Sequence, residues 1–272
     1  MVKMTLAVTD IVNCKDWKGL REQFLSNVPF NHVLIDDFFV PQIAEQLAAE
    51  FPQYDSDVWN AHYNNPLENK KACNHWDKFP PTTYNSFSYL CSKSFTNIIS
   101  TITGNSDINA DIGLHGGGLH AHTTNGKLNV HLDYSIHPKL KLQRKYNLIV
   151  YITPQWQPQW NGGLEFWNHD ECSNQPSNFS KLIVNKFNRA VLFDTTQNSW
   201  HGLSANLSCP ENITRSSMAV YYVTTPSHNT DPRGKALFAP TLEQSNNIDI
   251  LELIQKRSNA ETASQVYKTN SK

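Results

Sequence analysis

Short apolar runs separated by clusters of glycine, proline and asparagine recur from Gly113 to Thr225, and they constrain the fold more than any other feature. Such a succession of short runs and turn residues is typical of a small β-sandwich or barrel. We therefore predict a mainly β fold with flanking α-helices. The expected strands are Leu128–Leu132, Tyr146–Thr153, Gly163–Trp167, Lys181–Asn185, Ala190–Asp194 and Ser216–Thr224.

The first hundred residues have a mixed pattern in which helices are prominent. Residues 31–39 predict a strand, and Pro41 then opens a helix, because proline is favoured in the first turn. Residues 55–81 are polar and interrupted by prolines, which predicts a loop and leaves open whether it is a lid. A helical period returns over Ser86–Thr103 and ends at Gly104.

These patterns divide the chain into three segments of what we expect to be one compact domain. Residues 1–110 form an N-terminal α/β segment with supporting helices, residues 111–227 form the β core, and residues 228–272 form a C-terminal extension. The extension is polar apart from Ile248–Ile254, which predicts one amphipathic helix, and residues 258–272 are expected to be mobile.

Charge and cysteine content exclude several classes of protein. A net charge of −1 gives no basic field for nucleic acid or an anionic membrane, so we expect neither as a partner. The five cysteines include no C-x-x-C pair, which argues against a disulfide framework or a zinc ribbon. The N-terminal apolar stretch is short and broken by polar residues, so we expect a cytoplasmic protein without a signal peptide.

A His-x-Asp pair, His131 and Asp133, ends the first expected strand of the β core. Residues two apart on a strand point to the same face, so the imidazole and the carboxylate can bind one metal ion together. The pair alone is weak evidence. A chain of this composition, with 11 histidines, is expected to contain roughly half a His-x-Asp pair by chance.

Similar pairs occur at His75 and Asp77 and at His169 to Glu171. The first lies in the expected loop, where no strand fixes its geometry, and the second lies in a polar segment that predicts a solvated turn. Five further expected strands follow His131 and Asp133, so the context favours that pair.

A third ligand is expected at His201, directly after the expected strand Ala190–Asp194. Two histidines and one carboxylate leave three metal positions open, the arrangement typical of non-haem Fe(II) oxygenases. For His201 by itself, a surface or structural role is the more common alternative.

Arg215 begins the last expected strand, which is otherwise apolar. Its guanidinium keeps its charge and needs an anionic partner when buried, and its planar fork matches a carboxylate. Tyr151 shares a strand face with Asn147 and Ile149, so its hydroxyl could reach the same carboxylate; a core aromatic is the equal alternative.

With these residues in place, residues from about Gly117 to Thr225 resemble the prolyl 4-hydroxylase-like branch of the Fe(II)/2-oxoglutarate dioxygenase superfamily. The resemblance rests on several motifs in the family's order and at compatible spacings. They are GGGLHAHTTNGKLNVHLDYSIHPKLKLQRKYNLIVYITPQW, WNGGLEFW, FNRAVLFD, SWHGLS and RSSMAVYY. The 14 residues from His201 to Arg215 exceed the family spacing, so residues 205–214 are expected to form an extra loop whose role stays open.

The resemblance implies a double-stranded β-helix, or jelly roll, with His131, Asp133 and His201 as iron ligands. It also implies that Arg215, assisted by Tyr151, binds 2-oxoglutarate, and it names ascorbate as an additional candidate cofactor. The implied activity is hydroxylation of an organic substrate with O2, giving succinate and CO2.

Three hypotheses about the substrate and the activity remain. The branch resembled favours hydroxylation of a prolyl or other side chain in a protein or peptide. A small molecule or sugar unit is the second hypothesis, because this fold serves many substrates. The third is a cupin-like module that binds metal without turnover.

Overall fold

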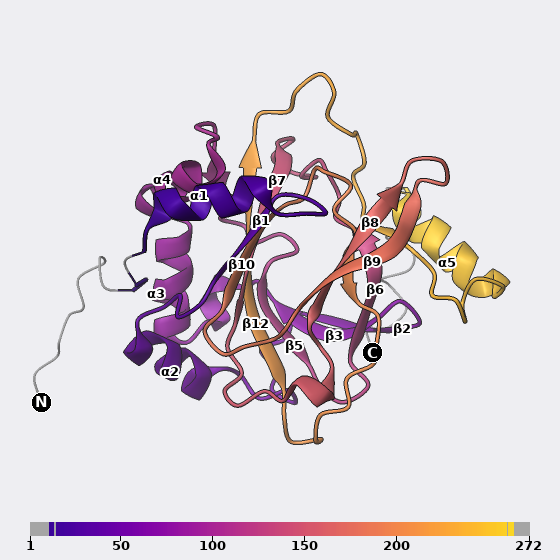
Figure 1. Cartoon of the computed structure of the whole chain (residues 1–272). Helices are drawn as coiled ribbons and strands as arrows, with labels where there is room; N and C mark the ends of the chain where they lie inside the picture. The colour runs from indigo at the N-terminus through magenta and orange to yellow at the C-terminus, as the bar shows by residue number, and fades with distance from the viewer. Residues whose placement is uncertain (1–10, 14, 260, 264–272) are drawn as a thin grey trace, which may run out of the picture.

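The computed structural model describes residues 11–13, 15–259 and 261–263. Its strands form one hydrogen-bonded sheet that curls on itself, and every strand pair is antiparallel (Figure 1). The order is β1-β10-β7-β12-β5-β3-β6-β11-β8-β9, with β2 beside β3, β4 beside β12 and β13 beside β6. The bounds are β1 His32–Ile35, β2 Ala61–Asn65, β3 Glu68–Cys73, β4 Asn109–Ala110, β5 Gly118–His122, β6 Lys127–Leu132, β7 Gln143–Tyr151, β8 Leu164–Asp170, β9 Gln175–Ile183, β10 Ala190–Asp194, β11 His201–Leu203, β12 Arg215–Thr224 and β13 Leu237–Phe238.

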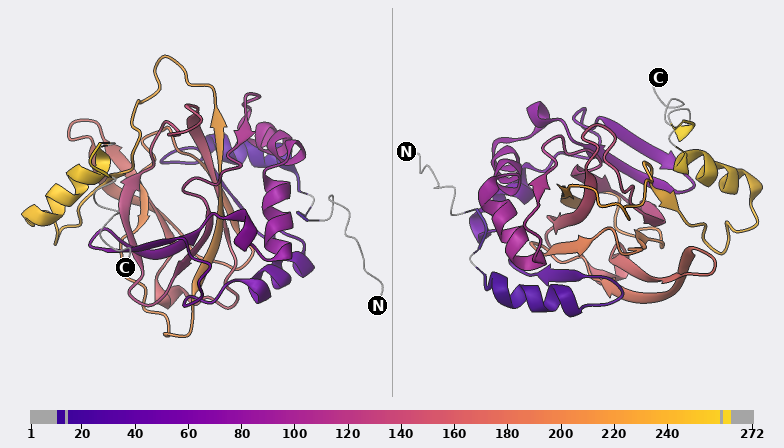
Figure 2. Two further views of the ribbon diagram at one scale, coloured as in Figure 1. Left: turned by 180° about the vertical axis from the view of Figure 1, so that it is seen from behind. Right: turned by 90° about the horizontal axis from the view of Figure 1, so that it is seen from above.

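Four helices cover one side of the sheet and a fifth lies at the opposite side (Figures 1 and 2). They are α1 Trp17–Ser26, α2 Pro41–Glu50, α3 Pro81–Leu90, α4 Lys93–Thr103 and, on the opposite side, α5 Ile248–Ser258; short 3-10 turns span Trp76–Lys78 and Pro158–Trp160. None of the helices within the described ranges is long and apolar enough to cross a membrane.

Strand β7 shows how the two faces of the curled sheet divide. Leu148 and Val150 belong to the large apolar core that the sheet shares with helices α1 to α4. The alternate residues Asn147 and Ile149 line a cavity inside the curl, as the period of two along a strand requires. The interior of the curl is therefore free to hold a site, while the helices stabilise its outer face.

The predicted fold class is confirmed: the chain is mainly antiparallel β, curled as a jelly roll, with a few flanking helices. Strand β10 has the predicted bounds, and β6 and β12 begin one residue before theirs. The predicted strand Lys181–Asn185 was wrong at both ends, because β9 pairs with β8 along a long polar hairpin. Polar residues at these positions gave no strand signal.

The predicted helix over Ser86–Thr103 is two helices. Residues 91 and 92 separate them, and the Ser92 hydroxyl caps α4 by accepting a hydrogen bond from the Phe95 amide at 3.2 Å. Gly104 ends α4 with φ of 75°, as the sequence predicted.

The predicted loop over residues 55–81 was wrong in its middle part, because residues 61–73 form the hairpin of β2 and β3. β3 pairs with both β5 and β6, so this hairpin connects the two halves of the curled sheet. Gly118 permits the close approach of β5: its φ is 89°, and a Cβ there would collide with the Cys73 carbonyl. The lysines and asparagines of the hairpin concealed its strands from the sequence pattern.

Candidate metal centre and co-substrate pocket

Two paired strands bring His131, Asp133 and His201 together inside the curl. His131 on β6 lies directly opposite His201 on β11, and Asp133 follows β6 on the same face as His131. One ligand atom from each of the three lies within 4.8 Å of the others, and all three side chains are buried. Among the described residues, no other group of three or more His, Cys, Asp or Glu side chains has geometry suited to a metal ion.

Backbone carbonyls fix the orientation of both imidazoles. His131 Nδ1 lies 3.0 Å from the Asn129 carbonyl, and His201 Nδ1 lies 2.7 Å from the Ser199 carbonyl. A carbonyl only accepts, so each Nδ1 carries the proton and each Nε2 presents a lone pair. Burial lowers the pKa of His131 to about 3, and the neighbouring His201 adds to the shift. A neutral imidazole is the form that binds a metal.

Asp133 is held in its ionised form. Burial acts to raise its pKa, but His201 and Arg144 outweigh that effect and lower the pKa to about 2. The Tyr221 hydroxyl donates a hydrogen bond to Asp133 Oδ2 at 3.0 Å, which also fixes the carboxylate's direction. The carboxylate oxygens lie 3.7 and 3.8 Å from Nε2 of His131 and His201, so they face both lone pairs.

Arg215 opens β12 at the other end of the same cavity, whose volume is roughly 150 Å³. The side chain is buried, and its Nε donates to the Gly162 carbonyl at 2.7 Å. Gly162 has φ of 77°, and a Cβ there would lie 3.0 Å from Arg215 Cδ, so glycine gives the arginine its room. Within the described ranges no carboxylate forms an ion pair with Arg215, so a buried cation lacks its counter-ion.

Tyr151 lies beside Arg215. Its ring centroid is 5.1 Å from the Arg215 guanidinium carbon, and the side chain is fully buried. Burial raises the pKa of the Tyr151 phenol, so the group stays a neutral hydrogen-bond donor. The ring also belongs to a small apolar cluster with Phe166 and Phe193, which is the core role that the sequence offered as the alternative.

The other two His-x-Asp-like pairs do not form metal sites. His75 and Asp77 are exposed, as the sequence predicted. His169 and Asp170 lie on β8 rather than in the predicted turn, and His169 Nδ1 accepts a hydrogen bond from Trp200 Nε1 at 2.9 Å. His169 therefore has a structural partner.

Sequence reasoning missed three residues of this cavity: Tyr221, Arg144 and His122. The Arg144 guanidinium is stacked between the rings of Tyr134 and Tyr221, with its carbon 3.7 and 3.1 Å from their centroids. His122 lies opposite Arg215 in the β5–β12 ladder. Burial lowers the His122 pKa well below its usual range, so this ring is neutral. All ten residues of β12 are buried, so alternation could not single out Tyr221.

The residues present fit iron and 2-oxoglutarate chemically. Two imidazoles and one carboxylate supply three ligand atoms and leave other metal positions open. The arginine without a carboxylate partner, in the same cavity, matches the free carboxylate of a dicarboxylic acid.

Comparison with known proteins agrees with this chemistry. Residues 117–223 match the family model of the 2OG-Fe(II) oxygenase superfamily. No curated protein sequence matches the chain significantly.

Solved structures with a similar fold include the following three. A Pseudomonas putida prolyl-4-hydroxylase is 15% identical, with a TM-score of 0.51 over 78% of this chain and 100% of that chain. A Trichoplax adhaerens prolyl hydroxylase in complex with a hypoxia inducible factor peptide fragment is 17% identical, with a TM-score of 0.53 and coverages of 78% and 94%. HygX from Streptomyces hygroscopicus with nickel and 2-oxoglutarate bound is 14% identical, with a TM-score of 0.51 and coverages of 75% and 87%. Residues 117–223, which contain His131, Asp133, His201 and Arg215, therefore resemble the 2OG-Fe(II) oxygenase superfamily in sequence.

Proposed function

We propose that this chain is an Fe(II)- and 2-oxoglutarate-dependent hydroxylase in which His131, Asp133 and His201 bind the iron. The observation that carries the proposal is the convergence of these three buried ligand atoms within 4.8 Å. The presence of an unpaired buried arginine in the same cavity supports it further. When bound, iron and 2-oxoglutarate supply oxygen activation, which yields succinate, CO2 and a hydroxylated substrate.

The side chains of the chain orient and shield these groups. Arg215 binds the distal carboxylate of 2-oxoglutarate, and the Tyr151 hydroxyl assists it from the neighbouring strand. Tyr221 holds the Asp133 carboxylate by its 3.0 Å hydrogen bond. Phe238 stacks on His131 with ring centroids 5.1 Å apart, which keeps water from that side of the ligand.

Succinate formation tests the activity directly. We expect the iron-loaded protein to convert 2-oxoglutarate to succinate in an oxygen-dependent reaction, even without a second substrate. His131→Ala abolishes this turnover, whereas the exposed histidine variant His75→Ala retains it. Metal binding without oxygen-dependent loss of 2-oxoglutarate would instead support the cupin-like module. Ascorbate belongs to the proposal as an auxiliary cofactor, and an unchanged succinate yield when it is added removes it.

We propose a protein or peptide side chain, in the manner of prolyl 4-hydroxylases, as the first substrate class. The fold similarity to a prolyl hydroxylase in complex with a peptide fragment supports it. A small molecule or sugar unit is the second candidate, because a cavity of about 340 Å³ adjoins the centre and has the size of a small-molecule pocket. Proline-rich peptides and small metabolites, each tested for stimulation of succinate formation, separate the two classes.

A further inference from the structure

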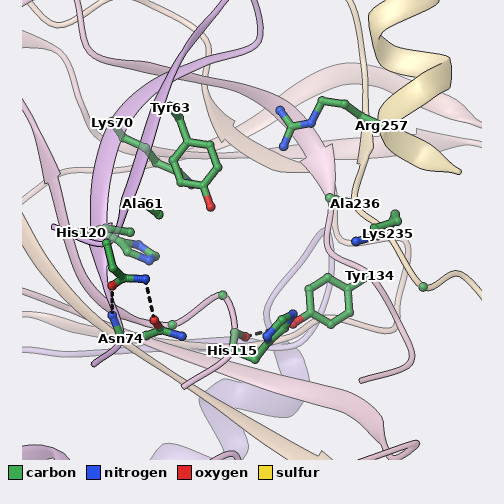
Figure 3. A pocket seen from close by; sticks show the side chains of 15 residues that line it. Ala61, Tyr63, Lys70, Asn74, His115, His120, Tyr134, Lys235, Ala236 and Arg257 are labelled. Atoms are coloured by element: carbon green, nitrogen blue, oxygen red, sulfur yellow. Dashed lines mark hydrogen bonds between the residues drawn. The ribbon is translucent and has the colours of Figure 1, made fainter. Parts of the chain in front are cut away.

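An outer cavity of about 340 Å³ opens beside the metal centre (Figure 3). Tyr63 from β2, Lys235 from the segment before β13 and Arg257 from α5 extend toward this hollow from different sides. The outer cavity adjoins the inner one, since both are lined by Tyr63, Lys70, Gly116, His120, Tyr134, Ala236 and Arg257. A molecule in the outer cavity would therefore reach the metal centre.

The charged side chains that line the outer cavity are all cations. They are Lys70, Lys235 and Arg257, and no aspartate or glutamate lines the cavity. The two lining histidines are neutral, because burial lowers the pKa of His115 to about 4 and that of His120 to about 3. The two histidines therefore add no positive charge to the lining.

The neighbouring carboxylate does not neutralise these cations. Glu68, which is buried, forms an ion pair with Lys70 at 3.4 Å and a second ion pair with Arg257. Lys235, the remaining cation of the lining, forms no ion pair within the part of the chain that is described. The lining keeps an excess of positive charge, which is costly in a partly buried place without a counter-ion.

A third buried arginine lies between the two cavities. Arg144 is 1% exposed, and its Nε and Nη2 have no hydrogen-bond partner within the described residues. A Cβ built on Gly116, which lines both cavities, would lie 3.3 Å from Arg144 Nη2. Gly116 and Tyr134, which both line the outer cavity, thus lie against the Arg144 guanidinium.

We propose that the outer cavity binds an anionic group, a carboxylate or a phosphate, of the molecule to be hydroxylated. The inference rests on the proposed function and specifies its substrate class. A neutral prolyl ring would leave this excess positive charge uncompensated, whereas an anion provides the missing counter-ion. The group would bind through Lys235 and Lys70, with Arg144 as the deepest cation.

Anion binding to the loaded protein tests the proposal. The protein is first saturated with nickel, which replaces iron and prevents turnover, and with 2-oxoglutarate, which fills the inner site. Inorganic phosphate is then titrated and its binding followed by calorimetry. We expect Lys235→Met to weaken phosphate binding about tenfold, since one charge-assisted contact is lost. Lys235→Arg retains binding, and Lys256→Met, a change to an exposed lysine on α5, has no effect.

Three results would overturn the proposal. They are no binding of phosphate, equal binding by wild type and Lys235→Met, and competition of phosphate with 2-oxoglutarate, which would mean that the charge steers the co-substrate. Failure of the protein to bind nickel and 2-oxoglutarate at all would instead contradict the proposed function, so the two failures are distinguishable.

Competition against bound phosphate then identifies the source of the anion. N-acetylglycine is compared with its neutral amide. A glutamate-rich peptide is compared with a glutamine-rich peptide of the same length. Displacement by one acid alone identifies a small acid or an acidic peptide as the substrate class. Equal displacement by the neutral partners would contradict the role of charge.

Discussion

The inner site, which consists of His131, Asp133, His201 and Arg215, and the outer cavity have lining residues in common but are built in different ways. The inner site takes its ligands from paired strands, where the register of β6 and β11 sets His131 opposite His201. The outer cavity collects Tyr63, Lys235 and Arg257 from segments far apart in the chain. The superfamily match covers residues 117–223, which include the inner ligands but not these three residues. Under the two proposals, the difference assigns the chemistry to the shared β core and the selectivity to the segments around it.

Loss of a metal ligand should have the largest effect on the inner site. We expect His201→Ala to lower metal affinity by more than the roughly 100-fold that loss of a supporting residue can cost, because a direct ligand atom disappears. Calorimetric titration of iron(II) under anaerobic conditions measures this. His169→Ala, which removes a partly buried histidine outside the centre, serves as the control. Equal metal binding by His201→Ala and wild type would contradict the inner site.

Arg215→Ala should weaken 2-oxoglutarate binding while iron stays bound. The loss of a buried charge partner costs about 2 kcal/mol or more, so we expect an affinity at least about 30-fold lower. Titration of 2-oxoglutarate into the iron-loaded variant measures it. Arg189→Ala is the matched control, because Arg189 already pairs with Asp36 at 2.6 Å on the surface. Unchanged co-substrate affinity in Arg215→Ala would remove the assigned role.

Tyr221→Phe should have a smaller effect on the same centre. Removal of a residue that orients a metal ligand lowers metal affinity about 10–100-fold. Tyr222→Phe is a close control, because its hydroxyl donates to the Leu90 carbonyl instead, 3.1 Å away. Comparable metal affinities in the two variants would show that the hydrogen bond to Asp133 contributes nothing to binding.

The smallest expected effect is on the pH dependence of folding stability. It arises from His115, which lines the outer cavity. The pKa of His115 falls from 6.5 to about 4 on folding, because burial penalises its charged form. Above pH 6.5 neither state is protonated; as the pH falls toward 4 the unfolded state binds the proton first, so stability decreases. We expect His115→Gln to reduce this loss in urea unfolding at pH 7.5 and pH 5. An identical loss in the variant would mean that His115 is not protected from protonation.

The candidate residues of the inner cavity could be selected from the sequence because their signals are local to strands. An apolar run, the period of two and a buried arginine sufficed to select His131, Asp133 and Arg215. Tyr221 escaped because every residue of β12 is buried, which leaves no alternation to read.

The outer cavity was not predictable in this way. The polar residues of β2 and β3 gave no strand signal, so their hairpin was taken for a loop. Lys235 and Lys70 line one cavity only because the C-terminal extension folds back onto the barrel. Contacts between residues so far apart in the chain carry no sequence pattern.

The most direct test of the central claim is to locate the metal. Crystals grown with iron(II) under anaerobic conditions, measured by anomalous diffraction at the iron edge, should show one peak per chain. We predict that it lies between Nε2 of His131, Nε2 of His201 and the Asp133 carboxylate. A peak at another position, or none at full iron loading, would contradict the account.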